Sequence, residues 1–157
     1  MNICQAITDK MTDKFSLHKI YSGLYFPQPE KRMIIGIGID ILKVERIEKA
    51  IGRHGARFTN RVFTHGEQAY CSGKKNRYES LAARFSVKEA AFKALGRGWD
   101  ECGGFTSVEV VSDSNRRPSI VFHGRAKKIA DSLHVKNAFV TITHDSGVAA
   151  AVVVLEE

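Results

Sequence analysis

The segment ARFSVKEAAFKALGRG, residues 83–98, has the pattern of a helix that ends at a glycine, yet it carries Glu89 and Lys93 close to its apolar side. On an ideal helix Glu89 lies about 40° from Phe85, and Lys93 lies about 40° further round. An exposed glutamate and lysine four residues apart would stabilise a helix by only ~0.2–0.5 kcal/mol. This pair, taken alone, therefore has a purely structural explanation.

Two more acids and a histidine stand where strands are expected to end. Asp40 ends the run MIIGIGID, and His144 and Asp145 precede a Ser-Gly turn signal. Singly, such residues cap helices or form turns. If the fold brought Asp40, Glu89 and Asp145 together, their mutual repulsion would favour a cation. Mg²⁺ takes hard oxygen ligands and leaves places for substrate phosphates, which Lys93, one turn from Glu89, could also contact.

Length and composition indicate one globular domain of ordinary polarity. The chain has 157 residues, of which 43% are hydrophobic and 26% charged, and no apolar run approaches the ~20 residues of a membrane-spanning helix. A net charge of +7 favours acidic partners, whether nucleic acid, a phosphate-rich cofactor or an acidic protein. The three cysteines, Cys4, Cys71 and Cys102, form no C-x-x-C motif, so we expect neither disulfides nor zinc and predict a reducing cytoplasmic location.

The order of elements predicts an α+β fold with a mainly antiparallel sheet, because no βαβ unit repeats. Residues 1–32 contain two of the three prolines and keep no apolar period, so we expect an N-terminal extension before a domain at 33–157. Thr64 and Glu67 have the spacing of a capping box. The expected elements are a strand at 33–40, helices near 43–53, 64–71 and 78–95, a hairpin at 105–111 and 118–123, a helix at 124–134, and strands at 137–144 and 147–155.

Four motifs resemble, in their order, those of the holo-[acyl-carrier-protein] synthases. They are GIGIDILKVERI, FTHGEQAYC, ARFSVKEAAFKALGRG and TITHDSGVAAAVVV, and the likeness covers about residues 33–157. The resemblance implies a 4′-phosphopantetheinyl transferase that moves the 4′-phosphopantetheine arm of coenzyme A to a serine of an apo acyl carrier protein, for fatty acid biosynthesis. The other product would be adenosine 3′,5′-bisphosphate. Members of this single-domain type are expected to be homotrimers with active sites between subunits.

The resemblance also assigns roles to residues of this chain. Asp40 and Glu89 match magnesium ligands, and Lys93 matches a lysine that contacts phosphate. His144 matches a residue that contacts substrate or acts as general base, for which a metal-bound water is an equal candidate. Asp145 matches a further metal ligand that is found in part of the family.

Binding roles follow in the same way for the nucleotide and for the carrier. Arg84 matches an arginine near the coenzyme A phosphates, and Gly96 and Gly98 match a glycine turn whose backbone amides approach the nucleotide. Arg46 matches a residue that recognises an acidic carrier helix. The charge pattern, read independently, places Lys49 and Arg53 at helical spacing from it on a basic side of the helix at 43–53.

Two other functions remain open from the residues alone. A magnesium-dependent nucleotide phosphohydrolase would use the same acids, lysine and histidine, but it would transfer the phosphoryl group to water. A non-catalytic basic module could bind nucleic acid. The sequence disfavours it, because the basic residues do not alternate with aromatic ones in one tract and no nucleic-acid motif is present.

Overall fold

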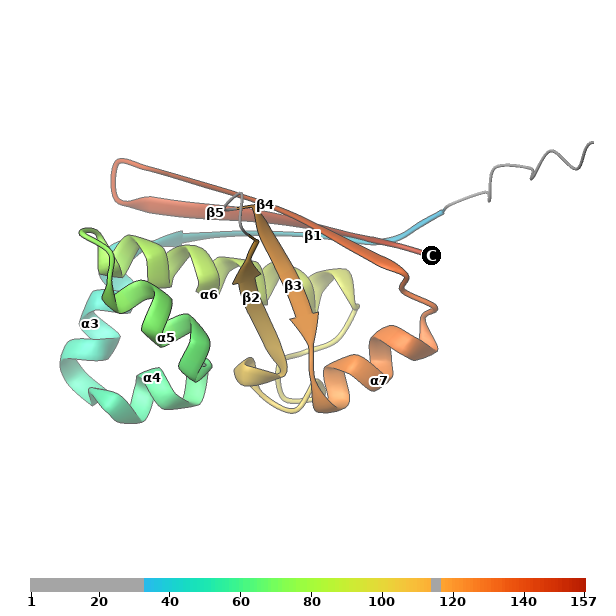
Figure 1. The fold of residues 1–157 in the computed structure, drawn as a ribbon, viewed down its shortest axis with the longest axis horizontal. Helices are drawn as coiled ribbons and strands as arrows, with labels where there is room; N and C mark the ends of the chain where they lie inside the picture. Colours follow the sequence, from blue (N-terminus) through green and yellow to red (C-terminus); the bar gives the residue numbers. More distant parts are fainter. Residues whose placement is uncertain (1–32, 114–116) are drawn as a thin grey trace, which may run out of the picture. The chain divides into compact units, whose positions relative to one another are not determined.

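A computed structural model describes residues 33–113 and 117–157, so the predicted extension at residues 1–32 lies outside the described part. Strands and helices combine with antiparallel pairing throughout, which confirms the predicted α+β fold (Figure 1). The elements are β1 (Ile34–Lys43), α3 (Val44–His54), α4 (Ala56–Val62), α5 (His65–Ser72), α6 (Arg77–Ala94), η1 (Phe105–Ser107), β2 (Val108–Ser112), β3 (Pro118–Phe122), α7 (Gly124–Ser132), β4 (Asn137–Asp145) and β5 (Val148–Glu156).

The strands form two antiparallel sheets. One has the order β1-β5-β4, and the other is the predicted hairpin of β2 and β3. The strand that begins at Asn137 was expected to end at His144, but β4 also includes Asp145. The turn consists of Ser146 and Gly147 alone, both with positive φ, which suits the tight connections that join twisted antiparallel strands.

The helices follow the predicted pattern with one correction. Thr64 and Glu67 form the expected capping box at the start of α5. Helix α4, however, was not predicted from the sequence. It has only seven residues, begins directly after Gly55, and is too short to show a helical period.

Helix α6 packs against the three-stranded sheet and is far more buried than a one-sided apolar stripe would suggest. Small residues such as Ala90 and Ala91 are fully buried on it. From β5, Ala151, Val153 and Leu155 complete the same core. Figure 1 shows α6 beneath the sheet, with α3, α4 and α5 at one end. Alternate residues of β5 face α6, so the run AAAVVVL supplies the apolar side chains of this core from the strand.

The contact between β1 and α6 is closest at two glycines. A Cβ atom on Gly36 would lie 2.1 Å from the Ala94 carbonyl oxygen, and one on Gly38 would lie 1.9 Å from that of Ala90. No real side chain tolerates such distances, so glycine is required at both positions. The strand backbone therefore rests directly on the helix.

The opposite face of the same sheet is apolar and exposed. Ile37, Ile39 and Ile41 are each more than 60% exposed, and Phe139 of β4 is 54% exposed. Val154 pairs with both Ile37 and Phe139 across the sheet, so these side chains form one continuous surface. Within the described part of the chain, no helix has the length and apolar character to cross a membrane.

We predict that Gly38→Ala lowers the free energy of unfolding by about 1–3 kcal/mol or more, because the added methyl group must separate β1 from α6. Gly52→Ala is the matched control: no atom lies within 4 Å of its Cβ position, and alanine in a helix interior should stabilise by about 0.5–1 kcal/mol. Chemical denaturation of both variants measures the difference. Equal stabilities would show that the strand and helix are not in close contact.

Candidate active site

Asp40 and Lys93 meet where β1 crosses α6. The Lys93 ammonium donates to Asp40 Oδ1 at 2.8 Å and to the Ile39 carbonyl oxygen at 2.9 Å. Asp40 lies two residues beyond Gly38, on the strand face that rests against the helix. The direct contact of backbone and helix thus brings an acid of β1 to the last turns of α6.

Glu89 belongs to the same group of charges. Burial raises its pKa above the ordinary value, and the negative charge of Asp40 raises it further, while Lys93 and Arg46 act in the opposite direction. The structure therefore places Asp40, Glu89 and Lys93 near one another, whereas Asp145, the third acid of the hypothetical metal site, is not among the charges that act on Glu89. Two neighbouring carboxylates that repel one another fit a divalent cation. Mg²⁺ commonly uses one or two protein carboxylates and fills its other positions with water and substrate phosphates.

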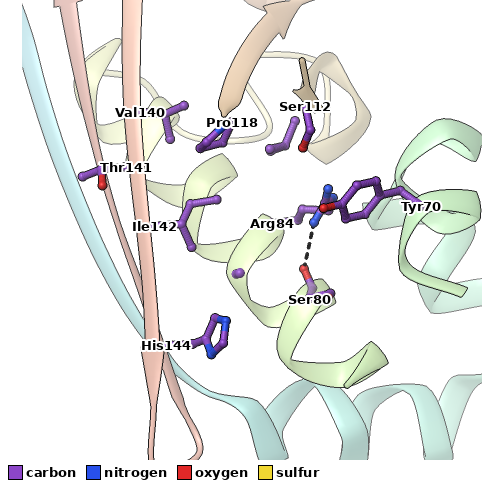
Figure 2. Close-up of a pocket in the computed structure, with 11 residues that line it drawn as sticks. Tyr70, Ser80, Arg84, Ser112, Pro118, Val140, Thr141, Ile142 and His144 are labelled. Atoms are coloured by element: carbon purple, nitrogen blue, oxygen red, sulfur yellow. Dashed lines mark hydrogen bonds between the residues drawn. The ribbon is translucent and has the colours of Figure 1, made fainter. Parts of the chain in front are cut away.

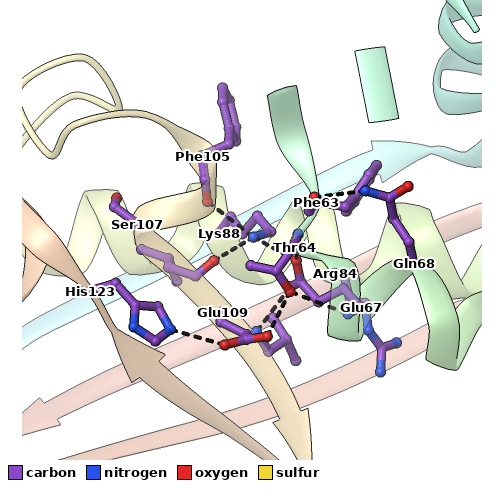
Figure 3. Close-up of polar contacts among 12 residues, drawn as sticks. Phe63, Thr64, Glu67, Gln68, Arg84, Lys88, Phe105, Ser107, Glu109 and His123 are labelled. Carbon is purple, nitrogen blue, oxygen red and sulfur yellow. Dashed lines mark hydrogen bonds and ion pairs between the residues drawn. The ribbon is translucent and has the colours of Figure 1, made fainter. Parts of the chain in front are cut away.

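Lys88, the residue before Glu89, is fully buried and was not predicted to have a role. Its ammonium forms an ion pair with Glu67 at 2.9 Å and donates to the carbonyl oxygens of Phe105 and Val108. All these partners lie outside α6 (Figure 3). Burial lowers the pKa of Lys88, an effect that the attraction of Glu67 counteracts. This lysine therefore attaches the middle of α6 to α5 and β2.

The partner carboxylate is equally well satisfied. Glu67 accepts hydrogen bonds from the backbone N–H groups of Thr64 and Val110, at 2.8 and 2.9 Å. The Thr64 hydroxyl donates to Glu109, which also contacts His123. The capping box explained Glu67 from the sequence, but only the fold shows that the same carboxylate neutralises a buried lysine. The feature of the sequence that could have revealed this ion pair is the position of Lys88 among the apolar residues of the helix.

A second feature is a cavity of about 330 Å³ beside α6. Arg84 lines it and is only 5% exposed, yet no carboxylate among the described residues pairs with it. Its Nη1 donates weakly to the Ser80 carbonyl oxygen at 3.4 Å, and its buried Nε has no partner. A buried guanidinium without an anion is costly. Arg84 is therefore the residue of this cavity that most needs an anionic ligand.

The other walls come from α5, from the β2–β3 hairpin and from β4 (Figure 2). Tyr70 contributes its ring, with the Arg84 guanidinium carbon 4.0 Å from the ring centroid. His144 lies at the end of β4, with its Nδ1 3.8 Å from a Glu79 carboxylate oxygen. The cavity thus joins Arg84 and His144, both of which were predicted to contact substrate.

These two features face different surfaces of one chain. Arg84 and Glu89 are five residues apart on α6, which turns them about 140° from one another. Asp40 is on β1 and His144 on β4, and β5 lies between these strands. Two strand spacings of ~4.8 Å each therefore lie between Asp40 and His144. Together with the opposite directions of Arg84 and Glu89 on α6, this makes the acid pair and the cavity of Arg84 separate within one copy.

The remaining predicted residues lie apart from both features. Asp145 is opposite Val148 in the sheet, three rows beyond Asp40 and two strands away, on the other face. It contacts Ser146. The amide of Gly96 donates to the Lys93 carbonyl and that of Gly98 to Glu101, so both are already engaged within the chain. Their ligand-binding roles stay predictions.

The predicted basic side of α3 is exposed and continues onto α4. Arg46, Lys49 and Arg53 are all exposed, and Lys49 also pairs with Glu45 of the same helix. A groove of about 340 Å³ follows, lined by His54, Arg57, Phe58 and Arg61. The basic surface is therefore larger than the sequence pattern indicated.

Comparison with known proteins identifies the family of the chain. Residues 36–153 match the model of the 4′-phosphopantetheinyl transferase superfamily. The chain belongs to this family. It is 41% identical over 124 residues to the holo-[acyl-carrier-protein] synthase of Solibacter usitatus, covering 79% of this chain and 99% of that protein. It is 44% identical over 127 residues to that of Koribacter versatilis, covering 80% and 100%.

Solved structures of the family have the same fold. The synthase of Neisseria meningitidis superposes with a TM-score of 0.74 at 26% identity, covering 80% of this chain and 100% of that one. The synthase of Helicobacter pylori, in complex with coenzyme A, has a TM-score of 0.67 at 33% identity, covering 76% and 98%. These comparisons confirm the predicted family, the predicted α+β fold and the prediction that the chain is an enzyme that transfers phosphopantetheine.

We predict that Glu89→Gln stabilises the fold at neutral pH. Since the pKa of Glu89 is raised in the folded state, the folded protein loses stability as the pH rises through that value. The amide removes this loss, so the gain over the wild type should be present at pH 7. It should vanish below about pH 4, where the carboxyl is protonated in both states.

Urea unfolding across this pH range, without divalent cations, measures the effect. The exposed Glu48→Gln is the matched control and should show no such gain. Addition of Mg²⁺ should raise the Tm of the wild type but not that of Glu89→Gln. A variant no more stable than the wild type at pH 7, with an unchanged response to Mg²⁺, would contradict the repulsive acid pair.

Proposed function

We propose that the chain transfers the 4′-phosphopantetheine group of coenzyme A to a serine of an apo acyl carrier protein, with Mg²⁺ held by Asp40 and Glu89. The observation that carries the metal assignment is the coupling of these two acids beside Lys93. The names of the relatives support the reaction, and the coenzyme A complex of the Helicobacter pylori synthase supports the donor.

The reaction is a phosphoryl transfer. The carrier serine oxygen forms a bond to the phosphorus next to pantetheine, and the bond from this phosphorus to the bridging oxygen breaks. Adenosine 3′,5′-bisphosphate leaves with that oxygen, and the serine proton passes to a base. When bound, Mg²⁺ would neutralise charge on the diphosphate. The residues of the protein mainly position the reacting groups and stabilise charge.

Lys93 and His144 are the residues of this chain that we assign to the reacting groups. The Lys93 side chain is 49% exposed next to Asp40, so its ammonium can contact a diphosphate there. The half-exposed His144 lines the cavity, where it can contact the substrate or accept the serine proton. Asp145 would be an additional metal ligand only from a neighbouring copy, because within one copy it lies on the other face of the sheet from Asp40.

We assign the cavity of Arg84 to the nucleotide end of coenzyme A, because this buried guanidinium lacks an anionic partner. The acid pair and this cavity lie on different sides of α6, because Arg84 and Glu89 are turned about 140° from one another on that helix. A site completed between copies removes this separation. The exposed face of Ile37, Ile39, Ile41 and Phe139 fits a second copy of this chain, and we propose a homotrimer.

We also propose that the chain is located in the cytoplasm. Cys71 and Cys102 are both free and buried, which supports a reducing compartment such as the cytosol.

The reaction is tested by incubating the chain with coenzyme A, Mg²⁺ and an apo acyl carrier protein, followed by mass spectrometry of the carrier. A gain of one phosphopantetheine group is expected, and none when the carrier serine is replaced by alanine. Glu89→Gln should slow transfer by at least about 100-fold, as the loss of several kcal/mol of charge stabilisation implies. Release of the nucleotide without a gain in carrier mass would instead indicate a phosphohydrolase.

We predict that Arg53→Glu raises the KM for the carrier several-fold and leaves the KM for coenzyme A unchanged. Arg53 is exposed on α3, whereas Arg46 also influences Glu89 and would disturb the acid pair. Charges of this kind mainly affect association, and salt screens them. Lys128→Glu on α7 is the matched control. If both variants have the carrier KM of the wild type at low salt, α3 does not bind the carrier.

A further inference from the structure

We propose that Glu79 is a positioning residue for His144: its carboxylate keeps the proton of the imidazole on Nδ1 and leaves Nε2 free to act on the substrate. The inference rests on the proposed function, in which His144 contacts the substrate or accepts the proton of the carrier serine. It gives a role to an acid of α6 that does not belong to the acid pair.

His144 lies on the face of β4 that is turned towards α6. It shares this face with Val140 and Ile142, which also line the cavity of Arg84, and Figure 2 shows its ring on the α6 side of the strand. Its Nδ1 atom is 3.8 Å from a carboxylate oxygen of Glu79, in the first turn of α6. Catalytic hydrogen bonds are often long before the substrate binds and shorten in the complex. An approach of about 1 Å would give a hydrogen bond here.

The Glu79 carboxylate is itself held at the start of its helix. Asn76, the N-cap residue of α6, makes no capping hydrogen bond with its side chain, and its amide donates to the same Glu79 oxygen at 2.8 Å. A negative charge in the first turn of a helix is also favoured by the helix dipole. The carboxylate is therefore oriented by α6, while the ring that it faces comes from β4.

A carboxylate at this place is unfavourable for the ligand of the cavity. Arg84 needs an anion, and a negative charge nearby repels one. The position of Glu79 is explained if the carboxylate serves the histidine. A carboxylate that accepts a hydrogen bond from Nδ1 fixes the tautomer and the orientation of an imidazole, so that Nε2 carries the lone pair.

This tautomer suits the transfer step. Nε2 accepts the proton of the carrier serine while the serine oxygen forms its bond to phosphorus and the bridging oxygen leaves with adenosine 3′,5′-bisphosphate. The ring then carries a positive charge and donates from Nδ1 to Glu79, which stabilises that charge. Glu79 therefore acts through His144 and needs no contact with the substrate.

The test compares transfer to an apo acyl carrier protein by the full chain with Mg²⁺, for Glu79→Ala, His144→Ala and the double variant. Glu79→Ala should lower kcat about 10- to 100-fold and leave both KM values nearly unchanged, because only the orientation of a general base is lost. In the His144→Ala background the same substitution should have little effect. Glu79→Gln, whose amide oxygen still accepts a hydrogen bond, should keep more activity. Asp131→Ala on α7 is the matched control and should not change kcat.

The tautomer gives a second measurement, which a purely structural role of Glu79 would not change. In ¹⁵N NMR of the neutral ring, His144 of the wild type should carry its proton on Nδ1, and Glu79→Ala should lose this preference. Thermal unfolding of each variant verifies the fold, and the wild-type spectrum decides even if Glu79→Ala fails to fold.

Three results would overturn the inference and leave the proposed function intact, provided that the wild type transfers phosphopantetheine. They are a wild-type ring with its proton on Nε2, an unchanged kcat in Glu79→Ala, and an equal loss from this substitution with and without His144. A wild type that transfers nothing to the carrier would overturn the proposed function itself.

Discussion

The backbone of β1 lies directly on α6 because Gly36 and Gly38 place no side chain between them. Asp40, two residues further on the same strand face, therefore reaches the part of the helix that carries Glu89 and Lys93. A Cβ atom at either glycine would push the strand away from the helix. It would thereby also move Asp40 on β1 away from Glu89 on α6. The candidate metal site is thus a consequence of backbone packing, and the two acids alone would not create it.

A buried ion pair fixes the same helix to the rest of the protein. Lys88 and Glu67 are both inaccessible, and each has further hydrogen bonds to backbone groups. Removal of one partner from such a pair typically costs about 3–5 kcal/mol, because the other charge is left uncompensated. With the rotation of α6 fixed at Lys88, Glu89 is directed to β1 and Arg84 to the cavity. The strand contact and the ion pair together orient both halves of the site.

Local patterns predicted most of the elements, since capping, turn residues and apolar periods are encoded within short segments. They did not predict α4, which is too short to show a period, or the burial of Lys88, whose partners lie in α5, η1 and β2. Glu89 and Lys93 could be paired with Asp40 through the family resemblance. The position of Asp145 depends on strand register and on a two-residue turn, and neither follows from residue types.

The central claim is that the acid pair of one copy works with the Arg84 cavity of another. Subunit mixing tests it: Glu89→Gln and Arg84→Met, each expected to be inactive alone, are unfolded together at equal amounts and refolded. In a ring in which each site combines the acid pair of one subunit with the Arg84 cavity of its neighbour, random mixing restores about a quarter of the wild-type number of intact sites. Transfer activity should recover to about the same fraction. An inactive mixture in which native mass spectrometry shows mixed oligomers would contradict the claim.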